Sequence, residues 1–364
     1  MRILSISILP VTMPKEDPTW RFALGASPQS DGFLVRLVTD EGHEGIGYTT
    51  AVPHLGAPAS RVLDDLRYLS RALGGGAVPS VAELDLLPGC HQAKAGIDIA
   101  LHDLAARERS VPLHRVLGSK VRDEVPLLRI LALKAPEQVA RIALGLVGEG
   151  YRYLKIKLDG DEETDVARVH AVREAVGPDV HLTVDANQSY RAPGAIRAAE
   201  RMAADRIELF EQPVPVGDVD GLAAVSEALE VPVEADESAQ SLDDIRRLID
   251  RHAVDSVSLK LPKLGGLAKA KAAAELCASS GVRCRVGATV GSRLVAAAGL
   301  HFAAVTPNIA YACELAEFAR LRDDPAEGLE PERGVLRVPQ GVGLGVTLKN
   351  GASEDPALPV RASS

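Results

Sequence analysis

The sequence predicts an α/β fold, a closed (β/α)8 barrel of the TIM type joined to an N-terminal α+β unit, and three observations support it. Eight short aliphatic runs lie between residues 125 and 314. Ala-rich segments of helix length, such as 165–176 and 192–204, separate them. Residues 1–122 have a different order, with strands first and helices after. Strands that alternate with helices are typical of a parallel sheet, and eight such units close into a barrel.

The N-terminal unit, residues 1–122, is predicted to be a strand meander packed on helices. Three extended runs come first, at residues 3–9, 33–39 and 45–47. A polar stretch at 15–31 holds the only Trp, and two helical patterns follow at 57–73 and 93–107. In the second pattern, Ile97, Leu101 and Leu104 share one face, as expected of a helix that packs on a sheet.

The barrel is predicted to occupy residues 123–325. Its eight expected strands are 125–131, 153–157, 181–185, 207–211, 231–236, 255–260, 283–287 and 309–314. The remainder, 326–364, is rich in Pro and Gly and has little helical pattern. We expect it to fold back as strand and loop over the barrel or the first unit.

Composition excludes several classes of partner. Hydrophobic residues make up 46% and charged residues 25%, which is ordinary for a globular protein. The net charge of −9 argues against nucleic acid or an anionic membrane as the partner. No run of about 18 apolar residues is present, so no membrane-spanning helix is expected. The first ten residues alternate like a strand and do not resemble a signal peptide, which makes the cytoplasm the expected location.

The four cysteines, Cys90, Cys277, Cys284 and Cys313, include no Cys-x-x-Cys pair. The nine histidines show no zinc-site spacing. Reduced, buried thiols are therefore expected.

Ionisable residues end five of the eight predicted strands. They are Lys157, Asp185, Glu211, Asp236 and Lys260, and successive members lie 28, 26, 25 and 24 residues apart. That spacing is about one βα unit of a barrel, so each falls at the carboxyl end of a strand, where barrel active sites form. We expect the five side chains to meet.

The three acids, Asp185, Glu211 and Asp236, would repel one another if packed without compensation. A divalent cation would remove that repulsion. Ligation by oxygen alone suits a hard ion, Mg²⁺ or Mn²⁺, and leaves positions for a bidentate substrate. The alternative is that these acids form salt bridges with the lysines.

The lysines are expected to supply a base and an acid. Lys155 and Lys157 lie two apart on one strand and so share a face, and adjacent ammonium groups lower each other's pKa. One of them can then act as a base near pH 7. Lys260 lies about half a barrel away and faces the other side of a bound substrate. A metal would stabilise the enediolate formed when a proton leaves the carbon next to a carboxylate. A lysine at a strand end without such partners would be a solvated charge.

These motifs together resemble the enolase superfamily, in its mandelate racemase/muconate lactonizing enzyme subgroup. The matching segments are Leu-Lys-Ile-Lys at 154–157, Val-Asp-Ala-Asn at 184–187, Phe-Glu-Gln-Pro at 210–213, Ala-Asp-Glu-Ser at 235–238 and Leu-Lys-Leu-Pro-Lys-Leu-Gly-Gly at 259–266. Lesser matches are 95–103 and 343–346, so the resemblance extends over nearly the whole chain.

The resemblance implies an N-terminal capping domain, a modified barrel and a C-terminal segment that returns to the cap. It implies Mg²⁺ on the three acids, and Lys157 and Lys260 as the acid/base pair with Lys155 tuning Lys157. Asn187 and Glu237 would support them from behind, the alternative being a turn residue and a surface acid. The substrate would be a small carboxylate and the protein a homo-oligomer.

Substrate contacts are expected from two cap loops, about 13–30 and 49–58, where Trp20, Arg21, Phe22, Pro53 and His54 are the candidates. Ordinary loop packing is the alternative. Racemisation or epimerisation of an amino-acid derivative is the favoured reaction, since a base on each face suits it.

Two departures from the subgroup bear on the substrate. Its dipeptide epimerases usually show Asp-x-Asp after the eighth strand, where this chain has Cys-Glu-Leu-Ala-Glu at 313–317. Its cycloisomerases usually carry a Glu after the seventh strand, where this chain has Gly-Ala-Thr-Val-Gly-Ser-Arg at 287–293. Arg293 is expected to meet a substrate carboxylate and Glu314 or Glu317 an ammonium group, with salt bridging in the barrel rim as the alternative.

Three further hypotheses of function stay open for the same residues. A cycloisomerase or a dehydratase would use the same enediolate with one lysine as base. A metal-independent aldolase would form a Schiff base on Lys260. A binding protein without catalysis would share the fold alone.

Overall fold

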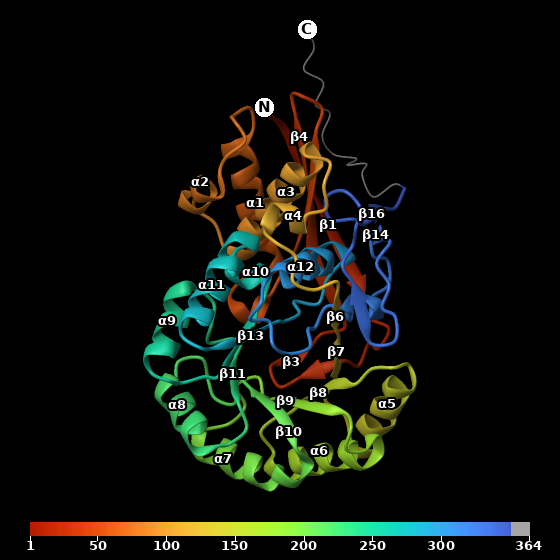
Figure 1. Cartoon of the computed structure of the whole chain (residues 1–364), viewed down its shortest axis with the longest axis vertical. Helices are drawn as coiled ribbons and strands as arrows, with labels where there is room; N and C mark the ends of the chain where they lie inside the picture. The colour runs from red at the N-terminus through yellow and green to blue at the C-terminus, as the bar shows by residue number, and fades with distance from the viewer. Residues whose placement is uncertain (351–364) are drawn as a thin grey trace.

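The computed structural model describes residues 1–350, and its N-terminal part forms a three-stranded antiparallel sheet backed by helices (Figure 1). The strands are β1 (Ile3–Pro14), β4 (Gln29–Thr39) and β5 (Glu44–Thr50), in the order β1-β4-β5. The helices are α1 (Ala59–Leu73), α2 (Val81–Leu86), α3 (His91–Glu108) and α4 (His114–Leu117). Helix α3 lies directly on β5, because a Cβ atom on Gly47 would come 2.1 Å from the Gly96 carbonyl oxygen. The predicted meander on helices is confirmed, with β1 longer than expected.

The polar stretch 15–31 forms a small hairpin, β2 (Arg21–Phe22) and β3 (Gly25–Ala26). Figure 1 shows it in red beside the barrel strands. Trp20 packs in a separate apolar cluster with Ile130 and Ala132 of the barrel. This contact fixes the stretch over one end of the barrel.

The barrel sheet contains seven parallel strands in the order β13-β12-β11-β10-β9-β8-β7. They are β7 (Leu128–Leu131), β8 (Tyr153–Lys157), β9 (His181–Asp185), β10 (Ile207–Glu211), β11 (Val233–Ala235), β12 (Ser256–Leu259) and β13 (Arg283–Val286). The eighth predicted run is not a regular strand. Parallel bridges join it to both edges, Ile309 to Cys284 and Cys313 to Leu127. The modified barrel is therefore present, and it closes through isolated bridges.

Helices lie outside the strands, as Figure 1 shows for α5 to α11. The barrel helices are α5 (Pro136–Gly148), α6 (Glu162–Val176), α7 (Ala192–Arg201), α8 (Val219–Ala228), α9 (Leu242–Asp250), α10 (Leu261–Leu264), α11 (Leu267–Ser279) and α12 (Arg293–Val305). Short 3-10 helices lie at Pro53–Leu55 in the N-terminal unit, at Ala203–Asp205 between the barrel strands, and at Glu317–Arg320 after the eighth run. Local capping starts several helices. Asp161, for example, accepts a hydrogen bond from the Thr164 N–H and satisfies a backbone donor that has no partner within the helix.

The C-terminal segment returns to the N-terminal unit. Strand β15 (Val335–Arg337) pairs with β6 (Glu124–Pro126), and β14 (Ala326–Glu327) pairs with β16 (Thr347–Leu348). The Leu344 N–H donates to Asp103 of α3 at 2.7 Å. Residues 351–364 of the predicted segment lie outside the described residues. Within residues 1–350, every helix is too short or too polar to cross a membrane.

Candidate active site

The register of the barrel strands brings the predicted acids and lysines to one level. Lys157 of β8 pairs with Asp185 of β9, and Asp185 pairs with Glu211 of β10. Asp236 and Lys260 directly follow β11 and β12. Paired positions on neighbouring strands face the same side of a sheet, and Lys157, Asp236 and Lys260 line the cavity at the end of the barrel.

A cavity of about 540 Å³ lies over this end of the barrel. Lys155, Lys157 and Lys260 line it together with Asp236 and Asn187. The prediction that Lys155 and Lys157 point inward is confirmed. In the sheet order, β8 and β12 are separated by three strands, so Lys157 and Lys260 approach the cavity from opposite sides.

Each of the three predicted metal ligands is buried and paired with lysine. Asp185 accepts from Lys157 at 2.6 Å and lies 3.2 Å from the Lys155 amine. Glu211 accepts from Lys155 at 2.9 Å. Asp236 accepts from Lys260 through one oxygen and from Lys263, at 2.8 Å, through the other. The salt bridges considered as an alternative are therefore present.

The pKa direction of Lys155 is opposite to our expectation, whereas that of Lys260 suits the expected acid. Burial opposes the charged form of Lys155, yet Glu211, Glu314 and Asp185 outweigh it and raise the pKa of Lys155 well above its ordinary value. Burial likewise opposes the charge on Lys260, and Asp236 outweighs it and raises the pKa of Lys260. The predicted lowering by neighbouring ammonium groups is wrong for Lys155, because three carboxylates contact its amine.

Asn187 and Glu237 form a hydrogen-bonded chain that begins at Lys157 of β8. The Asn187 side chain accepts from Lys157 at 2.8 Å and donates to Glu237 at 2.9 Å. Its own N–H donates to Asp185 at 2.9 Å. Asn187 has a positive φ of 41°, which an Asn tolerates better than most residues. Burial, then Asp236 and Asp185, raise the pKa of Glu237 to about 7.

Several buried ionisable residues were missed by the sequence analysis. Lys263 of α10 donates to the Asp236 and Ser258 carbonyl oxygens at 2.6 and 2.8 Å. Arg285 of β13 is fully buried and contacts Glu211, Glu234 and Glu314. Glu234 lies two residues before Asp236 on the same strand, so the alternation of side chains was an available signal for it.

Gln212 was also missed, and it fixes the backbone that carries Asp236. Its side-chain oxygen accepts from the N–H groups of Asp236 and Ser238, both at 3.0 Å. Gln212 itself has a positive φ of 37° immediately after Glu211. Strained backbone of this kind is typical of functional sites.

Of the predicted substrate contacts, five line the cavity and three do not. The five are Trp20, Phe22, Pro53, His54 and Glu314, and the three are Arg21, Arg293 and Glu317. The Arg293 guanidinium lies 3.1 Å from Asp324 and 2.8 Å from Glu330, and it donates to the Leu329 carbonyl oxygen at 3.1 Å. The expected contact between Arg293 and a substrate is therefore corrected: the C-terminal segment supplies acceptors that hold the guanidinium at the start of α12.

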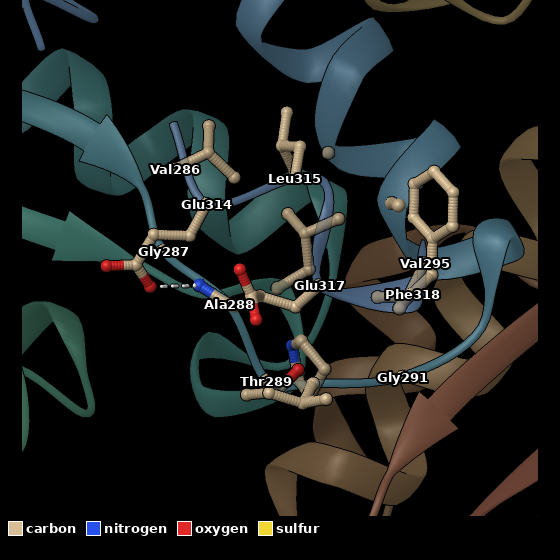
Figure 2. A pocket seen from close by; sticks show the side chains of 15 residues that line it. Val286, Gly287, Ala288, Thr289, Gly291, Val295, Glu314, Leu315, Glu317 and Phe318 are labelled. Atoms are coloured by element: carbon tan, nitrogen blue, oxygen red, sulfur yellow. Dashed lines mark hydrogen bonds between the residues drawn. The ribbon is translucent and has the colours of Figure 1, made fainter. Parts of the chain in front are cut away.

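Glu314 reaches the cavity wall with its charge already compensated. Figure 2 shows its carboxylate beside the N–H of Ala288, which donates to it at 2.7 Å. The other oxygen faces Lys155 and Arg285. Burial would raise its pKa, but Lys155 and Arg285 outweigh burial and hold the pKa of Glu314 far below its ordinary range. Glu317 pairs instead with Arg129 at 3.1 Å.

Comparison with known proteins decides the family. Residues 138–352 match the family model described as "Enolase C-terminal domain-like", and residues 4–118 match the N-terminal domain of mandelate racemase / muconate lactonizing enzyme. The chain belongs to the mandelate racemase/muconate lactonizing enzyme family. The resemblance inferred from its motifs is confirmed.

Relatives of this family member are isomerases. An N-succinyl-L-Arg/Lys racemase of Bacillus cereus is 28% identical over 93% of this chain and 97% of its own length. A hydrophobic dipeptide epimerase of Enterococcus faecalis is 30% identical, with coverages of 90% and 95%. A muconate cycloisomerase of Rhodococcus opacus is also 30% identical, and 96% of each chain is covered. The chain is accordingly an enzyme of the isomerase class.

Solved structures agree with this placement. A dipeptide epimerase of Cytophaga hutchinsonii, complexed with Mg and the dipeptide D-Ala-L-Val, superposes with a TM-score of 0.92 at 27% identity. That likeness covers 96% of this chain and 97% of the other. The two chains therefore share the capped, modified barrel.

The acids of this family member have the chemistry of a hard-cation site, although their present arrangement favours the lysines. Within residues 1–350, no group of three His, Cys, Asp or Glu side chains is arranged as a finished metal site. The lysines occupy most of the carboxylate oxygens. One oxygen of Glu211, however, is buried and has no hydrogen-bond partner.

Carboxylates and cations occur in equal number in this buried region once Lys15, which lines the same cavity, is included. Its acids are Asp185, Glu211, Glu234, Asp236, Glu237 and Glu314, and its other cations are Lys155, Lys157, Lys260, Lys263 and Arg285. Burial, together with Asp185 and Glu314, raises the pKa of Glu211 despite the opposing effect of Arg285. Carboxylate oxygens without His or Cys are the donor set that Mg²⁺ prefers.

Proposed function

We propose that the enzyme racemises or epimerises an amino-acid derivative by moving the proton on the carbon next to its carboxylate. The observation that carries the proposal is the placement of Lys157 and Lys260. Their amines enter one cavity from strands half a barrel apart, with the three acids on the strands between them. A substrate bound over those acids would present one face of its α-carbon to each amine.

The chain's own groups orient the two amines. Lys157 is held by Asp185 and Asn187, and Lys260 by Asp236. The lysine that starts unprotonated takes the proton from one face, and the protonated lysine returns a proton to the other. Trp20 and Ile130 form an apolar wall that excludes water from the reacting carbon.

We propose that Asp185, Glu211 and Asp236 hold Mg²⁺, with Mn²⁺ as a substitute. Bound there, the ion supplies positive charge that stabilises the enediolate oxygens. Lys155 would keep Asp185 and Glu211 together, since its amine lies within 3.2 Å of both carboxylates. Asn187 and Glu237 would position Lys157 from behind.

An N-acylated amino acid suits the cavity better than a free dipeptide. Glu314 was expected to meet a substrate ammonium, but its oxygens are taken by Ala288, Lys155 and Arg285. A substrate without an α-ammonium needs no such partner. The similarity to an N-succinyl-L-Arg/Lys racemase supports the same class.

Proton exchange in D₂O tests the proposal. The full chain with Mg²⁺ is incubated with both enantiomers of N-acetyl and N-succinyl amino acids and with dipeptides, and loss of the α-proton signal is followed by NMR. Exchange with both enantiomers, abolished by a chelator and restored by Mg²⁺, is expected. Absence of exchange in every substrate would overturn the proposal.

A cycloisomerase is the second candidate, because a muconate cycloisomerase is similar over nearly the whole chain. It needs one lysine as base, so it predicts exchange or turnover at one face only. The Schiff-base aldolase is disfavoured, because a Schiff base on Lys260 gives no role to the three buried acids Asp185, Glu211 and Asp236.

A further inference from the structure

Lys15, at the end of β1, is a buried cation that the proposed chemistry does not use. It lines the same cavity as Lys157 and Lys260, and only 7% of its surface is exposed. The other three lysines that line this cavity, Lys155, Lys157 and Lys260, are each paired with a carboxylate. Within residues 1–350, Lys15 has no carboxylate within ion-pair distance. A buried charge without an ionic partner is costly, which calls for a reason to keep it.

The surroundings hold the amine in place without neutralising it. Its nitrogen donates to the Ser27 hydroxyl at 2.8 Å and lies 3.6 Å from the centre of the Trp20 ring. Both contacts fix the position of the amine, and a cation over an aromatic face is favourable. The geometry is that of a fixed cation whose remaining hydrogen-bond donors are free for a ligand.

The acids near Lys15 each have other hydrogen-bond or ion-pair partners. Glu317 lies close enough to raise the pKa of Lys15, but it pairs with Arg129 at 3.1 Å and accepts from the Ile130 N–H at 3.3 Å. Asp17 pairs with Lys134 at 2.8 Å. Asp31 also lines the cavity, where it accepts hydrogen bonds from Thr12 and Gln29.

The amine is charged under ordinary conditions. Burial is the main cause that lowers its pKa to about 8, with Glu317 opposing the shift and Lys157 adding to it. A pKa near 8 leaves most of the Lys15 population protonated at pH 7. Lys15 and Lys157 line the same cavity, so one ligand bound there can meet both amines.

We propose that Lys15 binds a second carboxylate of the substrate, remote from the reacting carbon. This inference rests on the proposed function and names its substrate class: an N-acyl amino acid with one carboxylate over the three acids and another at Lys15. The remote carboxylate can come from the end of the acyl chain or from an acidic side chain. Both sources present the same anion to the same amine.

Two matched ligand pairs separate these sources. N-Succinyl-L-valine and N-butyryl-L-valine differ by a carboxylate at the end of the acyl chain. N-Acetyl-L-glutamate and N-acetyl-L-glutamine differ by a carboxylate on the side chain. Binding of each to the full chain with Mg²⁺ is measured by calorimetry. A charged hydrogen bond predicts that one charged ligand binds about 10- to 100-fold more tightly than its neutral partner, and the pair that shows this locates the carboxylate.

Variants assign the preference to one amine. Lys15→Met keeps the length and removes the charge, so the ratio of affinities should fall to about 1. Ser27→Ala, which removes the hydroxyl that fixes the amine, should lower the ratio less. Lys134→Met is the matched control, because Lys134 pairs with Asp17 beside the same stretch and does not line the cavity. It should keep the wild-type ratio.

The outcomes are distinguishable. Equal affinities within both pairs, or a preference that survives Lys15→Met, would overturn the role of Lys15 and leave the proposed reaction standing. If the charged ligand is preferred but no ligand or substrate exchanges its α-proton, the proposed function fails while the anion site stands. If Lys15→Met does not fold, Ser27→Ala takes its place, and a wild-type ratio of affinities in that variant would overturn the role of Lys15.

Discussion

Replacing Arg285 by Met should lower the free energy of unfolding more than replacing an exposed arginine does. The guanidinium is fully buried and contacts Glu211, Glu234 and Glu314. Met has similar length, so the change removes charge and hydrogen bonds with little loss of packing. It leaves Glu211 and Glu314 with Lys155 as their remaining close cation, and it removes the one cation that pairs with Glu234 within residues 1–350.

The size of the effect follows from these contacts. Breaking a buried ion pair by removing one partner costs about 3–5 kcal/mol. Two Arg285 nitrogens, Nε and Nη1, have no hydrogen-bond partner in the structure, so the native arrangement already carries an unmet cost. We therefore expect a loss near the lower end, about 3 kcal/mol.

Urea unfolding at pH 7, followed by circular dichroism without added metal, measures this loss. Arg283→Met on the same strand is the control, because Arg283 is exposed, and it should cost less than about 0.5 kcal/mol. Adding Glu234→Gln to Arg285→Met should restore about 1–2 kcal/mol, since one stranded carboxylate is removed. A loss under about 1 kcal/mol for Arg285→Met, or equal losses at both arginines, would refute the reasoning.

Three further changes test other parts of the structure. Burial lowers the pKa of His301 to about 4, so the folded state loses stability as pH falls from about 6.5 towards 4, by about 2 kcal/mol between pH 7 and pH 5. His301→Gln should remove that part of the acid sensitivity in unfolding curves at the two pH values. A Cβ on Gly287 would lie 2.2 Å from the Ser258 hydroxyl and 2.9 Å from the Lys260 Cε, so Gly287→Ala should lower kcat/KM about 100-fold by displacing Lys260. Arg293→Met should change kcat/KM less than about 3-fold in the same assay, yet cost about 1–2 kcal/mol in urea, because its partners are structural.

Each of these has a contrary result. Equal acid sensitivity in wild type and His301→Gln would show that the histidine is not the group that titrates. Full activity in Gly287→Ala would mean that Lys260 is not placed as the structure has it. A large rise in KM for Arg293→Met would return that residue to the substrate site.

The strand-end residues were predictable because two periodic signals coincide there. Alternation within a strand fixes which side chains point inward, and the βα repeat fixes which strand ends meet. Lys157, Asp185 and Glu211 needed no more than that. Division of the chain at residues 122 and 325, and assembly into a homo-oligomer, stay predictions.

The predictions for Arg293 and Lys155 were wrong, and Lys263 was missed, because their partners or directions depend on contacts distant in the sequence. The acceptors of Arg293 come from Asp324 and Leu329 in the C-terminal segment, and no local pattern announces them. Against burial, the pKa of Lys155 is raised first by Glu211 and then by Glu314, which reaches it from the irregular eighth run of the barrel. Lys263 lies in a four-residue helix, where neither strand nor helix periodicity indicates the direction of a side chain.

The opposed lysines are the centre of the account, and stereospecific exchange tests them most directly. Lys157→Ala and Lys260→Ala are each incubated in D₂O with Mg²⁺ and with either enantiomer of a turned-over substrate. Both variants should fail to racemise, and each should still exchange the α-proton of one enantiomer, a different one in each case. If both variants exchange the same enantiomer, or if either still racemises, the two amines do not act on opposite faces of one carbon.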